Sequence, residues 1–536
     1  MATYTLTLVD VRRVQRYLFN ANELKQNLGA SALIEQATHE MIIRNLPSPH
    51  NVEWDPDKFR VAFQDNQQIE KDGLTAEVIF MGGGNAAILF SSKPEAESFT
   101  RRFTREVMES APNLDIAVGH VDVVWDDRGA LETSWKDLRE NIMPKRKAGL
   151  GTSQPLLGLG VTAECAFTGL PAVHEEMDGN RGTLMSAESA AKKENVDFAQ
   201  ERLNALLKVE PFKYPASFDD LGGERGRARY IAVVHADGNR MGNRITNHTD
   251  NQDNREMVSQ MRLFSEALNQ VGTEAIEAVC DWVRVAHQLD TNNNYFIKDR
   301  WRPDEVIRFA ENYLPIRPIV FGGDDVTFVC DGRLGLALAS KFLESFSTAA
   351  LPDGKPGHAC AGVAIVHSHY PFARAYALAE ALCKDAKHQG YQHYGSTDIS
   401  LLNWHYASSG LTLDWEDITR REYQNGNLLL RPLVVNNEPD VSYSSWRTWK
   451  AFLDQIEFFR QDWKWGRNKL KDLREAMRKG SDDVRQFTSL YADLPVISGL
   501  EGQDAHRTGW YGDRCVYFDA LETDDLFIYP SEVNHE

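Results

Sequence analysis

The sequence predicts an α+β fold in which one unit of strands and helices occurs twice. Three features recur in the same order: a strand ending near an aspartate, a glycine-rich hairpin and a further apolar strand. They lie at 4–11, 78–90 and 114–123 in the first copy and at 230–237, 318–329 and 358–367 in the second. Each copy runs strand, helices, hairpin, strand, helix, which is typical of ferredoxin-like antiparallel sheets backed by helices.

Length and composition set the outer bounds of this prediction. A chain of 536 residues is too long for one hydrophobic core. Its 42% apolar and 26% charged residues are ordinary for a globular protein, and no apolar run reaches membrane-spanning length. The first residues indicate a strand, not a signal peptide, and six scattered cysteines indicate buried thiols. We therefore predict a cytoplasmic protein that makes no membrane contact.

Four domains follow from the repeat and from shifts in composition. We predict a first unit at 1–149, an irregular linker at 150–228, a second unit at 229–400 and a mainly helical domain at 401–536. The last domain holds seven of the twelve tryptophans, which indicate either a docking face or, more often, core. In the second unit we expect helices at 254–286 and 371–388, with Gly390 as the stop signal of the latter.

The formal net charge of −19 argues against a protein that coats nucleic acid with its whole surface. A local basic groove stays compatible with this charge. The basic segment 144–149 is one candidate, although a solvated basic loop explains it more simply.

The second hairpin is the most informative stretch of the chain. Here Gly322 and Gly323 precede two adjacent carboxylates, Asp324 and Asp325, between apolar flanks. The pattern predicts a tight turn that presents both carboxylates and lets a bulky ligand approach. Adjacent carboxylates repel each other unless a hard cation lies between them, and Mg²⁺ bound to a triphosphate is the usual one. For this tetrapeptide alone, an ordinary Asp-rich turn is the alternative.

A third carboxylate, Asp237, ends the strand that opens the second unit. Gly238 and Asn239 follow it directly, which is a turn signal. An acidic residue leaving one strand beside an acidic hairpin is the two-metal arrangement of palm-type polymerases and cyclases. One metal activates a 3′-hydroxyl, and the other neutralises the triphosphate and the leaving pyrophosphate. Taken alone, Asp237 is more often a turn residue.

The first copy lacks the paired carboxylates. Gly84 and Asn85 stand where Asp324 and Asp325 stand in the second copy. Asp10 is retained, but one carboxylate without the hairpin pair cannot hold two metals. We therefore predict a structural first copy and a catalytic second copy.

Further candidates are residues that would contact a nucleotide. Lys384 and Lys387 lie near the end of the helix predicted at 371–388 and could reach a triphosphate, while a solvated helix face explains them equally well. The nucleotide-binding candidates are Gly238, Asn239, Gly322, Gly323, Lys384 and Lys387.

Taken in order, these motifs resemble the large polymerase/cyclase subunit of type III CRISPR effector complexes, the Cas-ten/Cmr-two family. The similar segments are 9–19, 27–33, 82–85, 235–242, 322–325, 361–367, 370–375, 379–387 and 428–432. The resemblance implies two palm domains, a degenerate first and an active second, joined by an inter-palm linker and followed by a helical domain. It also implies conversion of ATP to cyclic oligoadenylate, with Asp237, Asp324 and Asp325 as metal ligands and activators of the 3′-hydroxyl.

The resemblance extends to cofactors and partners. It implies Mg²⁺ or Mn²⁺ at a two-metal site, ATP as substrate, and other effector subunits, guide RNA and target RNA as partners. The chain departs from the family pattern at two places. Many members begin with an HD nuclease domain, whereas the first palm strand here starts at Tyr4, so we expect that nuclease to be absent. The inter-palm zinc element normally carries CxxC pairs, but here Cys165 is followed by Thr168, so we expect no zinc.

Three functions stay open from the sequence. The first is a cyclic oligoadenylate synthase within an RNA-guided antiviral complex. The second is a stand-alone antiviral nucleotidyltransferase that makes a cyclic nucleotide without guide RNA. The third is a scaffold whose palms only hold other subunits, against which the three retained carboxylates argue. A diguanylate cyclase shares the palm, but its hairpin differs and no duplicated palm is expected there.

Overall fold

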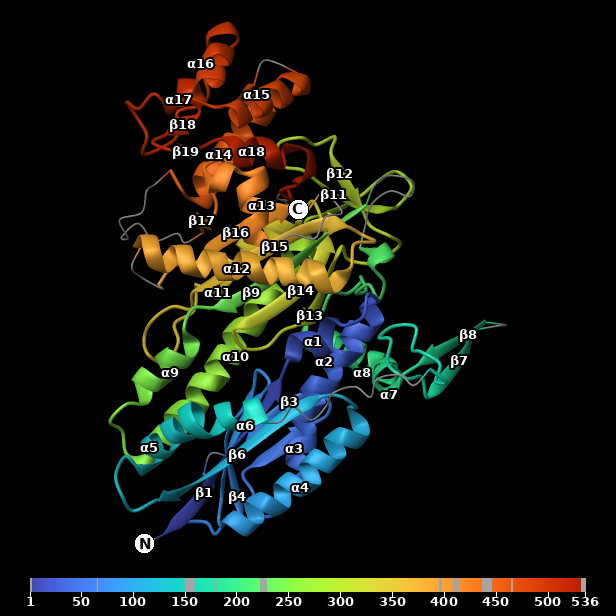
Figure 1. Cartoon of the computed structure of the whole chain (residues 1–536), viewed down its shortest axis with the longest axis vertical. Helices are drawn as coiled ribbons and strands as arrows, with labels where there is room; N and C mark the ends of the chain where they lie inside the picture. The colour runs from blue at the N-terminus through green and yellow to red at the C-terminus, as the bar shows by residue number, and fades with distance from the viewer. Residues whose placement is uncertain are drawn as a thin grey trace.

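The computed structural model describes residues 2–531 except 65, 150–159, 179–180, 222–228, 395–397, 408–413, 436–445 and 464–465. Two sheets with their helices are stacked along the long axis, with the N-terminal unit at one end and C-terminal helices at the other (Figure 1). The chain is thus a mixed α/β protein, as predicted in coarse form, and the domain boundaries stay predictions. No helix of the described part is long and apolar enough to cross a membrane.

The first unit is a four-stranded antiparallel sheet in the order β4-β5-β1-β6. Its strands are β1 (Thr3–Arg12), β4 (Ala76–Gly82), β5 (Asn85–Phe90) and β6 (Asp115–Val124). The accompanying elements are α1 (Val14–Phe19), α2 (Leu24–Thr38), α3 (Glu40–Asn45), α4 (Lys93–Ser110), α5 (Ala130–Asp137), α6 (Met143–Gly149), β2 (Val52–Asp55) and β3 (Arg60–Phe63). On α4 the apolar residues recur at helical spacing, and Phe99, Phe103 and Val107 are buried against the sheet. The basic segment at 144–149 is helical (α6) and not the loop we had predicted.

The second unit repeats this arrangement. Its sheet has the order β13-β14-β9-β15-β16-β17, and the first four strands are antiparallel as in the first sheet. The strands are β9 (Tyr230–Gly238), β13 (Ile316–Val320), β14 (Asp325–Asp331), β15 (Ala359–His367), β16 (Leu401–Tyr406) and β17 (Leu433–Val434). The recurrence predicted from the sequence is therefore present in the strand order itself.

Helices of the second unit follow the predictions with one correction. They are α9 (Met241–Thr249), α10 (Asn254–Val285), α11 (Gly335–Phe346) and α12 (Phe372–Tyr394), beside a small sheet of β10 (His287–Leu289), β11 (Tyr295–Lys298) and β12 (Val306–Arg308). We predicted that Gly390 ends α12, but the helix continues through it. A Cβ at Gly390 would lie 2.7 Å from Leu401 Cδ1, so this glycine allows close packing on β16 and does not stop the helix.

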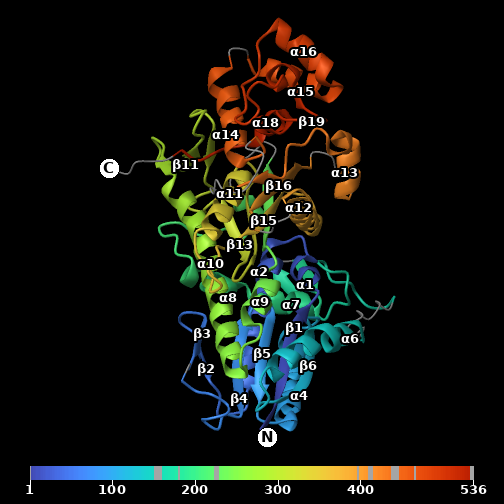
Figure 2. The same cartoon turned by 90° about the vertical axis from the view of Figure 1, so that its left-hand side faces the viewer.

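The long helix α10 connects the two units. It contacts β4 of the first sheet and β13 and β14 of the second (Figure 2). At its N-terminal end Arg255 and Arg262 both pair with Glu77 of β4, whose side chain is fully buried. These ion pairs join α10 to β4, and losing Glu77 would leave the largely buried Arg262 without its carboxylate partner.

The remaining elements form the linker and the C-terminal domain. They are β7 (His174–Asp178), β8 (Arg181–Met185), α7 (Ala187–Glu194), α8 (Val196–Leu206), α13 (Trp415–Glu422), α14 (Trp449–Glu457), α15 (Arg467–Lys479), α16 (Ser481–Leu490), α17 (Ala505–Thr508), β18 (Trp510–Tyr511), β19 (Arg514–Cys515) and α18 (Phe518–Thr523). The C-terminal tryptophans within the described residues pack in or against the core, so they do not form an open docking face; Trp465 lies outside these residues. All six cysteines are buried and unpaired, as predicted.

Candidate active site between the two sheets

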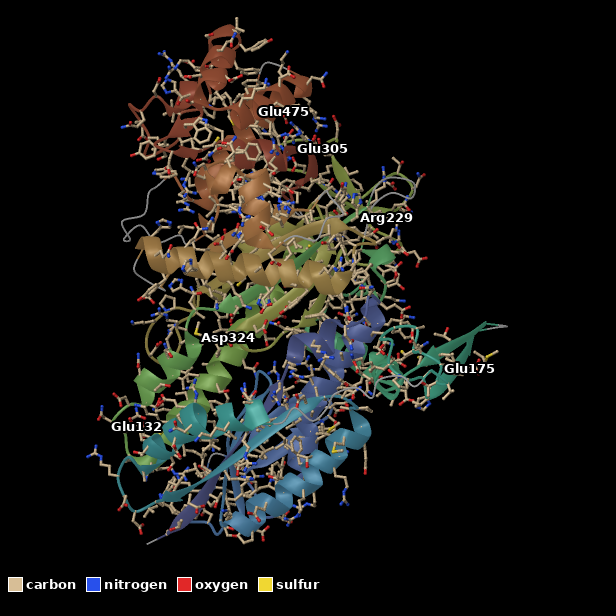
Figure 3. All side chains as sticks on the ribbon, viewed as in Figure 1. Glu132, Glu175, Arg229, Glu305, Asp324 and Glu475 are labelled. Atoms are coloured by element: carbon tan, nitrogen blue, oxygen red, sulfur yellow. The ribbon has the colours of Figure 1, made fainter. Side chains whose placement is uncertain are left out.

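Strand register places the predicted carboxylates side by side. Asp237 at the end of β9 lies directly opposite Asp325 at the start of β14. Asp324 lies in the turn near the middle of the molecule (Figure 3), and its carbonyl accepts a hydrogen bond of 3.0 Å from the Gly238 amide. A Cβ at Gly238 would lie 2.6 Å from Asp324 Cβ, so only glycine lets the two turns approach this closely.

Glycines shape the hairpin that carries Asp324. Gly322 and Gly323 have φ of 115° and 81°, a backbone region that side chains disfavour. Behind them α10 contributes Gly272, where a Cβ would lie 2.0 Å from the Gly323 carbonyl oxygen. Gly272 therefore supports the hairpin, although our sequence analysis missed it. The available signal was an isolated glycine inside a helical pattern, which often marks a close approach.

Two lysines predicted to contact a nucleotide have different surroundings. Lys387 Nζ lies 2.6 Å from Asp237 Oδ2 and donates to the Gly238 carbonyl at 2.8 Å. Although burial lowers it, the Asp237 carboxylate raises the pKa of Lys387 above its ordinary value. Lys384 is 70% exposed and pairs with Glu380 on the same helix, so only Lys387 is brought to the carboxylates.

Burial and neighbouring negative charge perturb the hairpin carboxyls. Burial and the neighbouring Asp237 carboxylate raise the pKa of Asp324 to about 6 and that of Asp325 to about 7. The Asp325 side chain stays 51% exposed, because it faces an open cleft while protein surrounds its other sides. Burial lowers the pKa of His235 to about 4, so this histidine, 3.4 Å from Asp325, is neutral at physiological pH and supplies no counter-charge.

Asp237, Asp324 and Asp325 have the oxygen ligands that a hard cation prefers, although their side chains do not meet at one point. Within the described residues no three His, Cys, Asp or Glu side chains lie close enough together to hold a metal ion. Asp237 turns instead to Lys387. The donor set still fits Mg²⁺ or Mn²⁺, because Asp237 and Asp325 lie at opposed strand positions, Asp324 lies in the adjoining turn, and carboxylate oxygens are the ligands that these hard cations prefer.

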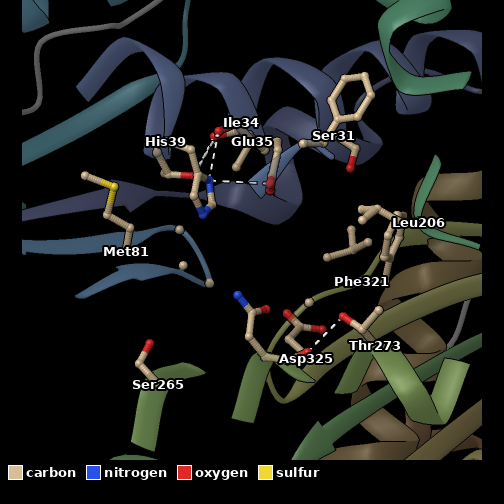
Figure 4. A pocket seen from close by; sticks show the side chains of 18 of the residues that line it. Ser31, Ile34, Glu35, His39, Met81, Leu206, Ser265, Thr273, Phe321 and Asp325 are labelled. Atoms are coloured by element: carbon tan, nitrogen blue, oxygen red, sulfur yellow. Dashed lines mark hydrogen bonds and ion pairs between the residues drawn. The ribbon is translucent and has the colours of Figure 1, made fainter. Parts of the chain in front are cut away.

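A cleft of about 650 Å³ opens between the two units, and of the three carboxylates only Asp325 lines it (Figure 4). Of the other predicted site residues, Gly238, Gly323 and Lys387 are also absent from its lining. Asp325 and Gly322 line it from the second hairpin, and Gly82–Gly84 line it from the first; Asn239 and Lys384 are not among its lining residues. Asn269 of α10 lies between the hairpins, since a Cβ at Gly322 would be 3.0 Å from its Oδ1 and one at Gly82 3.5 Å from its Nδ2. This volume is within the usual range of small-molecule sites.

Asn239 serves the framework of the site. Its side chain is buried, and its Nδ2 donates to the Ile399 carbonyl at 2.6 Å. Its backbone amide donates to the His358 carbonyl at 2.8 Å. These bonds tie the turn after Asp237 to the segments that lead into β15 and β16.

The segment at Cys165 is held by hydroxyl groups. Cys165 Sγ lies 3.3 Å from Ser189 Oγ, and Thr168 Oγ1 lies 3.3 Å from Ser186 Oγ. The two serine hydroxyls are in turn 3.3 Å apart. Burial would raise the pKa of Cys165, but hydrogen bonds from Ser189 and Thr168 lower it to about 6. Cys165 and Thr168 thus face Ser186 and Ser189, and hydrogen bonds join the two pairs.

Comparisons with known proteins agree with this geometry. Residues 230–393 match the family Cas10/Cmr2, second palm domain. Three solved structures share the fold across 98% of this chain, all from Csm1-Csm4 cassettes. The one in complex with pppApApA has a TM-score of 0.56 at 13% identity over 69% of its chain. Those with cA3 and with one ATP have TM-scores of 0.51 and 0.50 at 15% and 14% identity, each over 70% of its chain. No curated protein sequence matches the chain significantly.

Proposed function

Starting from the Cas10/Cmr2 second palm domain that residues 230–393 form, we propose that this chain is a nucleotidyltransferase that joins ATP into cyclic oligoadenylate. The observation that carries the proposal is the register of β9 and β14, which sets Asp325 opposite Asp237 with Asp324 in the adjoining turn. Three carboxylates at the end of a central strand pair are the core of palm-type nucleotidyl transfer. The cleft that Asp325 lines has room for nucleotide substrates.

Each residue of the site has a role in this reaction. Asp237, Asp324 and Asp325 would hold two divalent cations, Mg²⁺ or Mn²⁺, which supply activation of the 3′-hydroxyl and neutralise the triphosphate. Gly322 and Gly323 keep the hairpin free of side chains, so that a nucleotide reaches the carboxylates. Lys387 balances the charge of Asp237 and, once Asp237 turns to a cation, is free to approach a phosphate.

The substrate and the setting follow from the structural relatives. Csm1-Csm4 cassettes, whose fold this chain shares, were crystallised with ATP, pppApApA and cA3, which supports adenine nucleotides as substrates here. We accordingly place the chain in the cytoplasm as the large subunit of a type III CRISPR antiviral effector, with a Csm4-like subunit, guide RNA and target RNA as partners.

One experiment tests the reaction and its setting together. The purified chain is incubated with each nucleoside triphosphate and Mg²⁺ or Mn²⁺, with and without its effector subunits, guide RNA and target RNA, and products are identified by mass spectrometry. We expect cyclic oligoadenylate from ATP in the complete complex. A cyclic product from the chain alone would instead establish the stand-alone synthase. Nucleotide binding without any product would contradict the proposal and leave a scaffold.

A further inference from the structure

A second, smaller cavity of about 190 Å³ lies on the other side of α1 from the cleft. Val14 and Leu18 of α1 line the cleft, whereas Arg16 and Tyr17 line the small cavity. Its volume is below the range of about 300–1,000 Å³ that holds whole small molecules. A ligand there would therefore insert one small group, not a complete nucleotide.

Arginines dominate the lining of this cavity. Arg12, Arg13 and Arg16 come from the end of β1 and the start of α1, and Asp115 and Glu188 are the acidic members of the lining. We call this cavity the arginine pocket. It carries a local positive charge in a chain whose formal net charge is −19, so general surface composition does not explain it.

Both acidic residues of the arginine pocket already have cationic partners. Asp115 lies 3.4 Å from Arg12, whose side chain is only 10% exposed, and Glu188 lies 2.6 Å from the buried Lys192. Arg13 and Arg16 are exposed and form no ion pair with any described residue. Two guanidiniums thus remain at the mouth with their donors directed to no protein acceptor in that part of the chain.

A buried hydroxyl adds an independent sign of a ligand. Tyr17 lines the arginine pocket and is 4% exposed, yet its hydroxyl has no hydrogen-bond partner among the described residues. Buried hydroxyls are almost always hydrogen-bonded, so this one indicates a partner that is not among the described residues, such as a bound ligand. A phenolic O–H can donate to an anionic oxygen beside the two arginines.

We infer that the arginine pocket binds a phosphate group, supplied either by an RNA strand or by a free phosphate. Guanidinium groups match phosphate oxygens in pairs of parallel hydrogen bonds, and an added O–H donor completes a site of this size. This inference goes beyond the proposed function: it needs no turnover, and the carboxylates of the cleft take no part in it.

The test measures binding by the full chain without triphosphate or divalent metal. Fluorescein-labelled single-stranded RNA is titrated with the chain and followed by anisotropy, and inorganic phosphate is titrated separately by calorimetry. The variants are Arg13→Asn with Arg16→Gln, and Tyr17→Phe alone. Asparagine suits position 13, because Arg13 has φ of 50°. The matched control is Arg101→Gln with Arg105→Gln, two exposed arginines of the same unit outside the arginine pocket.

We expect the arginine double variant to weaken binding at least about tenfold and to reduce the slope of log affinity against log salt by about one to two. Tyr17→Phe should weaken binding severalfold without lowering thermal stability, since the lost hydroxyl bonds no group among the described residues. RNA binding that excess inorganic phosphate displaces indicates a site open to either source, and RNA binding that resists phosphate indicates a strand. Equal binding by the double variant and the matched control, or no binding of either probe by the wild type, would overturn the inference.

Discussion

The two units share one backbone arrangement but carry different side chains at the hairpin. In the first, Asn85 lies opposite Asp10; in the second, Asp325 lies opposite Asp237 at the same place in the strand order. The site thus differs by a carboxylate replaced with an amide at one paired position and by Gly84 in place of Asp324. An amide cannot supply the charge that a divalent cation requires, so only the second unit has the carboxylates that the proposed two-metal reaction needs.

The backbones of the two units also share irregular features. A strand irregularity precedes each hairpin by the same interval, between Val78 and Phe80 and between Pro318 and Val320. The residue three positions after each aspartate is an arginine in the left-handed region, Arg13 with φ of 50° and Arg240 with φ of 53°. Strained backbone conformations of this kind cost free energy, yet they also occur in the first unit, which lacks the paired carboxylates. The shared backbone by itself therefore does not define the function.

Even the counter-charge is duplicated. Lys147 on α6 pairs with Asp10, as Lys387 on α12 pairs with Asp237, and both helices follow the equivalent strands β6 and β15. The segment considered as a basic groove thus contributes this ion pair. A lysine beside the strand-end aspartate is therefore not what distinguishes the second unit, and the hairpin residues are.

The largest contrast between the units should come from removing the hairpin carboxylates. We expect Asp324→Ala with Asp325→Ala to lower product formation by about 10³-fold or more, because the cation ligands are lost. Asn85→Ala, the matched change in the first unit, should leave the rate within about twofold. Product formation measured by mass spectrometry under identical loading of ATP and metal checks both.

Measuring thermal stability distinguishes the loss of activity in the double variant from a loss of folded protein. Folding raises the pKa of Asp324 to about 6 and that of Asp325 to about 7, so the folded state binds these protons more tightly than the unfolded chain does. Their contribution to stability therefore falls as pH rises from about 4 to about 7. At pH 7.5 the double variant should unfold no earlier than the wild type. A lower melting temperature, or an unchanged rate, would contradict the assignment of the site.

What could be predicted from the sequence was local. The hairpin glycines, both carboxylates and the repeat lie in contiguous segments whose pattern fixes their conformation. Gly272 and Asn269 could not be found this way, because their importance depends on how α10 packs against two distant hairpins. Likewise, helical spacing placed Lys384 and Lys387 one turn apart, but only the packing of α12 decides which of them faces Asp237.

The support behind the second hairpin gives the next contrast. Gly272→Ala would place a methyl group 2.0 Å from the Gly323 carbonyl, so α10 or the hairpin must shift. A displacement of about 1 Å at reacting groups can cost about 100-fold in rate, which is the loss we expect. Gly83→Ala in the first hairpin meets no atom within 4 Å and should cost only the strain of its φ of 58°. Equal activity of the two variants would show that the hairpin position is not critical.

The duplicated lysines provide a smaller contrast. Lys387→Ala leaves Asp237 and the Gly238 carbonyl without their cation, and we expect activity to fall about tenfold, equivalent to about 1.4 kcal/mol. Lys147→Ala removes the equivalent pair from the first unit. Because Lys147 is 43% exposed, this should change the free energy of unfolding by less than about 1 kcal/mol and leave the rate unchanged. Steady-state rates measured at several ATP concentrations compare the activities of the two variants, and urea unfolding compares their stabilities.

The smallest effect should come from making the first unit resemble the second. Asn85→Asp places a carboxylate opposite Asp10, and like charges at facing strand positions cost about 0.2–1 kcal/mol of the free energy of unfolding. Because a divalent cation between them would relieve that repulsion, millimolar Mn²⁺ should restore the lost stability in urea unfolding. Asn85→Ala lacks the new charge and should show no such rescue. If Mn²⁺ rescued both variants or neither, a carboxylate at position 85 would not be enough to bind a cation in the first unit.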